Sequence, residues 1–134
     1  MGLMDFFKPK YKHDDWNVRK EAIKKLDDES KLIEILKNDE SASVREVAVK
    51  KINDGDVLQD IAKNYNDAYV RLLAAEKIDD QETLKDLAKN GKNSTRGLAI
   101  IRLTNEEVLT DIAENAKLHS DRQIAENRLK QLKS

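Results

Sequence analysis

The sequence predicts an all-α fold, an α-α superhelix of about four and a half helix pairs that are each 25–26 residues long. Two observations lead to this prediction. The first is a repeated segment: VRKEAIKKL begins at Val18 and returns as VREVAVKKI at Val44 and VRLLAAEKI at Val70, with weaker copies at Arg96 (RGLAIIRL) and Arg122 (RQIAENRL). The second is the apolar spacing, which follows the i, i+3, i+4 pattern of amphipathic helices and not the alternation of strands.

The repeats divide the chain into consecutive helix pairs. We place them at residues 15–39, 40–65, 66–91 and 92–116, followed by a terminal helix at 118–133. In each pair the first helix carries the repeated segment, and a second amphipathic helix follows a short polar turn. Residues suited to begin the second helices are Asp28, Asp54, Asp80 and Asn105, and residues suited to end them are Asn38, Asn64, Asn90 and Asn115. Between Asn90 and Arg96 the chain is one residue shorter than at the other junctions, which a loop tolerates. Because one pair cannot bury its own apolar face, we expect residues 15–134 to stack as a single repeat domain.

Each repeated segment keeps an arginine among apolar residues, namely Arg19, Arg45, Arg71, Arg96 and Arg122. On a helical wheel, Arg19 falls within the apolar arc formed by its neighbours in the segment. A guanidinium without acceptors would be costly in this position. Asp15 and Asp67 precede their arginines by four residues, and turn carbonyls should lie nearby. We therefore predict that the arginines form a structural ladder from repeat to repeat, rather than a catalytic or phosphate-binding site.

The pattern D-x-x-V-R-x-x-A-x-x-x-L resembles the HEAT and HEAT-like (bilin-lyase-type) repeats, from about Asp15 to the end of the chain. In that family the aspartate and the arginine form a ladder along the turns. The five arginines match the pattern, but only Asp15 and Asp67 match its aspartate, and Ser41 replaces it in the second unit. The resemblance implies a HEAT-like solenoid whose second helices line the concave surface. It says little about activity, because the family contains scaffolds and a few enzymes.

Two charged columns are candidates for binding. On the second helices, Glu34, Asp60, Asp86 and Asp111 share one register and are predicted to contact a partner protein. Lys37, Lys63 and Lys89 lie three residues further on, so a solvated face with local ion pairs is the alternative interpretation. On the first helices, Lys25, Lys51, Lys77, Arg102 and Arg128 form a basic column. Favourable placement at helix C-termini explains this column more simply than binding of nucleic acid.

Residues 1–14 form a predicted N-terminal arm. Phe6, Phe7, Tyr11 and Trp16 in or beside it are four of the six aromatic residues in the chain. Such a segment can cover the first repeat or anchor the protein to a membrane surface or to a partner. We expect it to be a cap, with Trp16 beneath it, because terminal segments of repeat arrays usually cover an exposed apolar end.

The composition narrows the function classes. The chain has 134 residues, a net charge of −1 and a pI near 6.2, so a basic excess typical of nucleic-acid binders is missing. It has no cysteine, no apolar run long enough to span a bilayer and no recognisable signal peptide, which predicts a cytoplasmic protein.

Catalysis finds little support in the sequence. His13 and His119 are the only histidines, and no H-E pair, G-x-S-x-G or P-loop motif is present. We expect no catalytic residue, cofactor or metal. The sequence favours a monomeric, non-enzymatic scaffold or adaptor that binds another protein and not nucleic acid. The alternatives are a nucleic-acid binder that uses the basic column and a peripheral membrane protein that uses the N-terminal arm.

Overall fold

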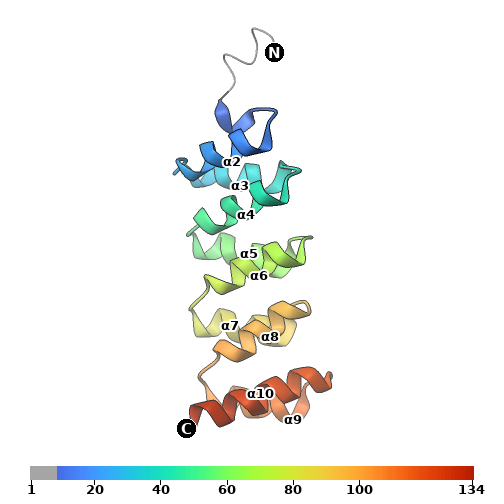
Figure 1. The fold of residues 1–134 in the computed structure, drawn as a ribbon. Helices are drawn as coiled ribbons and strands as arrows, with labels where there is room; N and C mark the ends of the chain where they lie inside the picture. Colours follow the sequence, from blue (N-terminus) through green and yellow to red (C-terminus); the bar gives the residue numbers. More distant parts are fainter. Residues whose placement is uncertain (1–8) are drawn as a thin grey trace. The chain divides into compact units, whose positions relative to one another are not determined.

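The computed structural model describes residues 9–134, which are all-α and contain no strand, as the sequence predicts (Figure 1). Contacts divide the chain into two units, of which the first ends at Asp54 and the second begins at Gly55. The first unit contains η1 (Lys10–Lys12), α2 (Trp16–Lys24), α3 (Glu29–Asn38) and α4 (Ala42–Lys51). The second contains α5 (Gly55–Asn64), α6 (Ala68–Glu76), α7 (Gln81–Asn90), α8 (Ser94–Arg102), α9 (Glu106–Asn115) and α10 (His119–Leu132). Within the described part, none of these helices has the length and apolar character that crossing a membrane requires.

Side-chain caps fix where the helices begin. Asp28 accepts hydrogen bonds from the backbone N–H groups of Ser30 (3.0 Å) and Lys31 (3.3 Å). Asp80 accepts from Thr83 N–H at 2.9 Å, and Asn105 accepts from Val108 N–H at 3.1 Å. These bonds confirm three of the predicted N-caps. Because each cap satisfies an N–H group that has no partner inside the helix, it contributes about 1 kcal/mol to helix stability.

The second helices end at the predicted asparagines, Asn38, Asn64, Asn90 and Asn115. The asparagines that end the second helices do not adopt the left-handed conformation, and Asn93 is the one non-glycine residue with positive φ in the described part. Instead, the side-chain amides of Asn64, Asn90 and Asn115 each donate to an aspartate four residues earlier, at 2.9 Å. The amide therefore holds an acidic side chain in place rather than reversing the backbone.

The core of the first unit lies between α3 and the pair α2 and α4. Both α2 and α3 contact α4, and η1 packs on α2. Ile23 of α2 and Leu32 and Leu36 of α3 are almost completely buried. Each such side chain contributes at most about 1.5–3 kcal/mol by leaving water.

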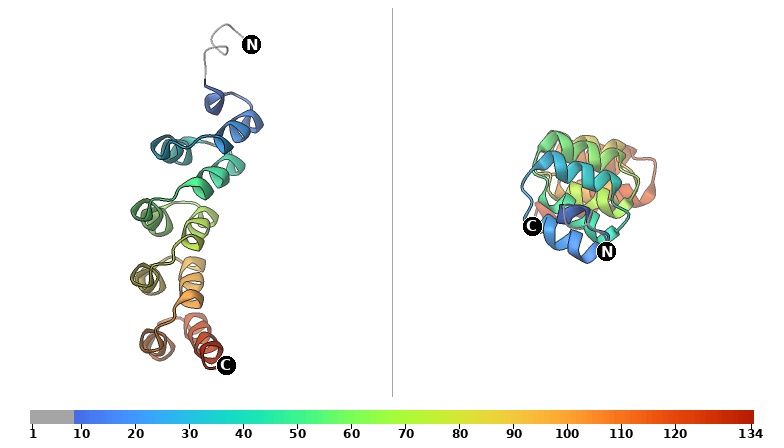
Figure 2. Two further views of the ribbon diagram at one scale, coloured as in Figure 1. Left: turned by 90° about the vertical axis from the view of Figure 1, so that its left-hand side faces the viewer. Right: turned by 90° about the horizontal axis from the view of Figure 1, so that it is seen from above.

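The second unit consists of two rows of helices, with α6, α8 and α10 in one row and α5, α7 and α9 in the other (Figure 2, left). The repeated alanine is fully buried in the first row, at Ala74, Ala99 and Ala125. A small side chain at this place lets neighbouring helix backbones approach each other closely. The core between the rows is filled by larger residues, such as Leu84 and Leu109.

The predicted N-terminal arm is described only in part, because Phe6 and Phe7 lie outside the described residues. From Pro9 onward, one turn of 3-10 helix is followed by an extended stretch that leads into α2. Tyr11 is half-buried, with the Lys31 ammonium 5.7 Å from its ring centre. Trp16 is 48% exposed at the start of α2. The described part of the arm thus lies against the first helix pair.

Candidate functional site

The five repeated arginines share one contact: each donates a hydrogen bond from Nη1 to a backbone carbonyl five or six residues earlier. The acceptors are His13 and Asp14 for Arg19 (both 2.8 Å), Asp39 for Arg45 (2.8 Å), Tyr65 and Asn66 for Arg71 (2.6 and 3.1 Å), Gly91 for Arg96 (3.0 Å), and Ala116 and Lys117 for Arg122 (2.6 and 3.1 Å). Every arginine therefore holds the loop that leads into its own helix. A charged donor satisfies loop carbonyls that have no partner in a helix.

Arg19 and Arg96 also reach an acid in a following element. Arg19 binds Asp39 with two bonds, Nε–Oδ2 at 2.9 Å and Nη2–Oδ1 at 3.2 Å. Arg96 Nε donates to Asp121 Oδ2 at 2.9 Å, with the two side chains 17% and 11% exposed. Asp15, which the motif suggested as an acceptor, instead caps α2 by accepting from Asn17 N–H at 2.8 Å. The acids that complete these pairs are thus not the ones four residues before the arginines.

Between α6 and α8, the described residues show no such pair of an arginine and an acid. Arg71 is only 7% exposed, and its Nε is buried without a hydrogen-bond partner among the described residues. Thr95 is 1% exposed, and its buried hydroxyl likewise has no hydrogen-bond partner within residues 9–134. Thr95 directly precedes Arg96, just as Asp121 directly precedes Arg122. Thr95 therefore occupies the position in its repeat that Asp121 occupies in the next repeat.

The predicted acidic residues are held by neighbouring side chains. Lys63 of α5 binds Asp86 of α7 at 2.7 Å, and Lys89 of α7 binds Asp111 of α9 at 3.1 Å. The lysines thus pair between successive second helices, not with the acid three residues earlier. Lys63, followed by Asn90, lowers the pKa of Asp86 below its ordinary value. For Asp111, the Asn115 amide lowers the pKa most, and Lys89 adds to it.

The other two acids have fewer contacts. Asp60 is exposed and accepts from Asn64 at 2.9 Å. Glu34 is exposed on α3, where its backbone carbonyl accepts from the Asn38 amide at 3.0 Å. Glu34 belongs to the first unit, whereas Asp60, Asp86 and Asp111 belong to the second.

Lys51, Arg102 and Arg128 of the basic column cap the ends of helices. Lys51 Nζ donates to the carbonyls of Lys24 (2.7 Å) and Ile23 (3.2 Å), at the end of the preceding first helix. The same contact recurs in the second unit. Arg102 Nη1 donates to the carbonyls of Glu76 (2.7 Å) and Ala75 (3.0 Å), and Arg128 Nε donates to that of Leu103 (2.9 Å). Cations at these places satisfy terminal carbonyls and the negative end of the helix dipole.

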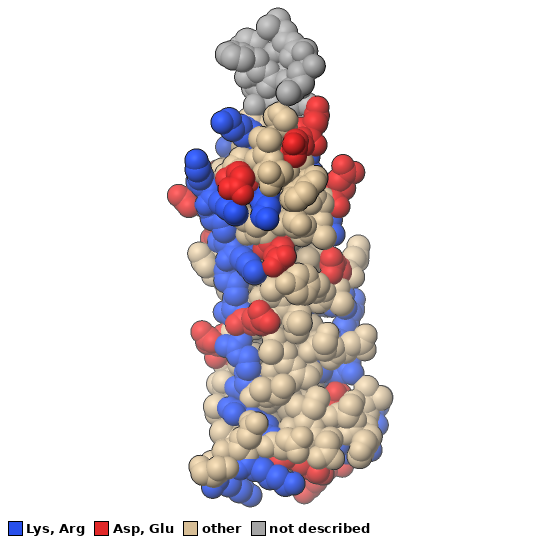
Figure 3. All heavy atoms as spheres, viewed as in Figure 1, with Lys and Arg blue, Asp and Glu red and all other residues tan. Residues whose placement is uncertain are grey.

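A further surface was missed by the sequence reasoning. We name it the uncharged face: Tyr69 and Leu72 of α6, Ser94, Gly97 and Ile101 of α8, and Ser120, Gln123 and Asn127 of α10. At the register of Ile101, α6 has the exposed Glu76, which lies at the border of this face. Tyr69 is 51% exposed and Ile101 is 49% exposed. Figure 3 shows few charged atoms over these three helices, with lysine, arginine and acidic side chains gathered along the edges. Such a surface is unusual in a chain of which 38% is charged.

The signal for this face is present in the sequence. The equivalent outward positions of α2 and α4 hold Lys20, Lys24, Glu46 and Lys50, whereas those of α6, α8 and α10 are uncharged apart from Glu76. In α4, Glu46 and Lys50 form an ion pair at 2.9 Å. Comparing outward columns for loss of charge, rather than for a shared sign, would have found it.

The next question is whether metal-binding side chains or the two histidines cluster in residues 9–134. Residues 9–134 contain no group of three or more His, Cys, Asp or Glu side chains that could hold a metal ion. His13 lies in the first unit, where its Nδ1 accepts from Asp15 N–H at 3.0 Å, and His119 lies in the second. The candidate sites in these residues are exposed surfaces and a cavity that Arg96 and Lys117 line.

Comparison with known proteins gives no assignment: no family model, curated protein or solved structure matches the chain.

Proposed function

We propose that the chain is a HEAT-like solenoid whose repeats are joined by polar contacts at their turns. Three observations support this architecture. Helix pairs recur with the sequence period, the second unit has two rows of helices, and every repeated arginine holds the loop before its own helix. Solenoids of this kind present extended surfaces for binding.

The function that we propose is that of a non-enzymatic scaffold or adaptor that binds another protein. The uncharged face carries this proposal. Exposed aromatic and aliphatic side chains in a surface poor in charge are typical of the centre of a protein interface, where charged residues are depleted. Tyr69 and Ile101 supply the apolar anchors, while Ser94 and Gln123 supply neutral polar groups.

The charged columns are less suited to this role. Asp86 and Asp111 are each bound by a lysine and an asparagine, so a partner would have to compete with existing bonds. Lys51 and Arg102 donate to helix-end carbonyls, which directs their charge toward the protein rather than toward a phosphate backbone. The acidic residues remain the second surface to be tested.

Photo-crosslinking tests the proposal directly. A photoreactive phenylalanine analogue is placed at Tyr69 or Ile101 of the full chain, and at Lys24 as the control, since Lys24 occupies the register of Ile101 on a charged helix. We expect discrete crosslinks to a protein from Tyr69 and Ile101, removed by excess unlabelled chain. The Lys24 variant should give none of these products. Crosslinks of equal yield from all three positions would contradict the proposal.

A further inference from the structure

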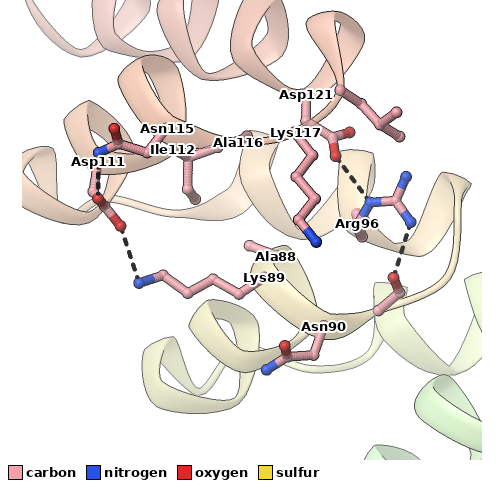
Figure 4. Close-up of a pocket in the computed structure, with 12 residues that line it drawn as sticks. Ala88, Lys89, Asn90, Arg96, Asp111, Ile112, Asn115, Ala116, Lys117 and Asp121 are labelled. Atoms are coloured by element: carbon pink, nitrogen blue, oxygen red, sulfur yellow. Dashed lines mark hydrogen bonds and ion pairs between the residues drawn. The ribbon is translucent and has the colours of Figure 1, made fainter.

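A cavity of about 550 Å³ opens in the second unit, between the ends of α7 and α9 and the start of α8 (Figure 4). Its apolar wall includes Ala88, Ile112 and Leu118, and Leu118 is 49% exposed. Arg96 and Lys117 supply nitrogen atoms on the other side. This volume lies within the usual range of ligand pockets, which are mostly apolar with a few polar groups.

The cavity lies where the repeat is irregular. Gly91 directly follows the last residue of α7, at the register where Tyr65 follows α5 with a half-buried ring. A Cβ atom on Gly91 would lie 2.5 Å from the Leu87 carbonyl oxygen, so the backbone requires glycine. The same loop is the one shortened by a residue, and it contains Asn93 at φ 41°. Departures from local rules in an otherwise regular protein concentrate at functional sites.

The charged side chains that line the cavity include one more cation than anions. Arg96 is bound to Asp121, and Lys89 is bound to Asp111. Lys117, by contrast, has no hydrogen bond or ion pair from its ammonium group to any residue in 9–134. Figure 4 shows its side chain extending from the loop after α9 toward the level of Ala88 and Arg96. Arg96 uses Nε for Asp121 and Nη1 for the Gly91 carbonyl, so Lys117 is the cation of the cavity that is available to a ligand.

We propose that this cavity binds the C-terminal residue of a partner polypeptide, with the terminal carboxylate at Lys117. One uncompensated positive charge matches a monoanion, whereas a dianionic phosphate would need more. The apolar wall would contact the side chain of the same residue. A C-terminal residue carries a carboxylate and an apolar side chain on one Cα atom, which matches a cation beside an apolar wall. The inference rests on the proposed protein-binding function and identifies one contact within it.

The test uses acetylated tripeptides that end in leucine, in free-acid and amide forms, titrated into the ¹⁵N-labelled full chain and followed by NMR. We expect the free acid to shift the signals of Gly91 and Arg96 and to bind about tenfold more tightly than the amide. Lys117→Glu should abolish this preference. Lys130→Glu is the matched control, because Lys130 is an exposed lysine of the same unit outside the cavity.

Four outcomes would overturn the inference. They are equal binding of acid and amide, an unchanged preference in Lys117→Glu, shifts that map away from the cavity, and equal binding of an amidated peptide whose only carboxylate is an internal glutamate. Because Lys117 is exposed, its substitution should leave the helical circular-dichroism signal unchanged. Failure here would leave the crosslinking result at Ile101 untouched, so the two proposals fail separately.

Discussion

Replacing Arg96 and Arg122 one at a time by alanine separates the two contacts that the repeated arginines make. Both donate to loop carbonyls, Arg96 to Gly91 at 3.0 Å and Arg122 to Ala116 at 2.6 Å. Only Arg96 also binds an acid, Asp121, at 2.9 Å with side chains 17% and 11% exposed. The difference between the variants therefore measures the ion pair between α8 and α10.

The expected magnitudes follow from burial. Arg122→Ala loses hydrogen bonds to carbonyls that water can reach, which should cost about 1 kcal/mol. Arg96→Ala loses the same kind of contact and leaves the largely buried Asp121 carboxylate without its cation, for a total of about 3 kcal/mol. The apolar stem of each arginine contributes similarly in both, so it does not affect the difference.

Urea denaturation followed by circular dichroism gives the free energy of unfolding for each variant. Asp121→Ala and the double variant complete a cycle, in which we expect a coupling energy of about 1–2 kcal/mol between Arg96 and Asp121. Equal losses for Arg96→Ala and Arg122→Ala, together with zero coupling, would refute the reasoning.

Three further predictions concern the same unit. Thr95→Val should raise the free energy of unfolding by about 1 kcal/mol in denaturant melts, because it removes a buried hydroxyl that has no partner in the described structure; a loss of stability would count against this reading. Asn93→Gly should stabilise by about 1 kcal/mol by relieving its positive φ, whereas Asn93→Ala should not. Lys63→Met should raise the pKa of Asp86 in an NMR titration, since Lys63 is the first cause of its lowered value. A carboxylate whose pKa is lower in the folded than in the unfolded state stabilises the fold at pH values above its unfolded-state pKa. This stabilisation is lost as the pH falls through the folded-state pKa. Because Lys63→Met removes part of it, the variant should lose less stability in acid than the native chain.

The regular features of the fold were predictable from the sequence. Helix period, turn positions and caps such as Asp28 and Asp80 depend on residues close together in the chain, and local rules describe them well. The same rules placed the arginines among apolar residues. They could not choose the acids, because Asp39 depends on how α2 lies against the end of α3, and Asp121 depends on how α10 lies against α8.

The candidate sites were less predictable. Sequence spacing suggested that Lys89 pairs along its own helix, but its long side chain reaches Asp111 on the neighbouring helix. The shortened loop was visible as a change of period, yet the need for glycine at position 91 follows from the path of the backbone. The uncharged face required comparison of outward positions between helices, and its exposure is a property of the folded chain.

The salt dependence of partner binding tests the central claim most directly. For the protein crosslinked from Ile101, affinity is measured by titration calorimetry between low and high salt, with the native chain, with Tyr69→Ser/Ile101→Ser and with Asp86→Lys/Asp111→Lys. If the uncharged face is the interface, affinity should change little with salt, the heat-capacity change should be negative, and the Tyr69/Ile101 variant should lose at least tenfold in affinity. An affinity that falls steeply with salt, is lost on reversing Asp86 and Asp111, and survives the Tyr69/Ile101 change would contradict the account.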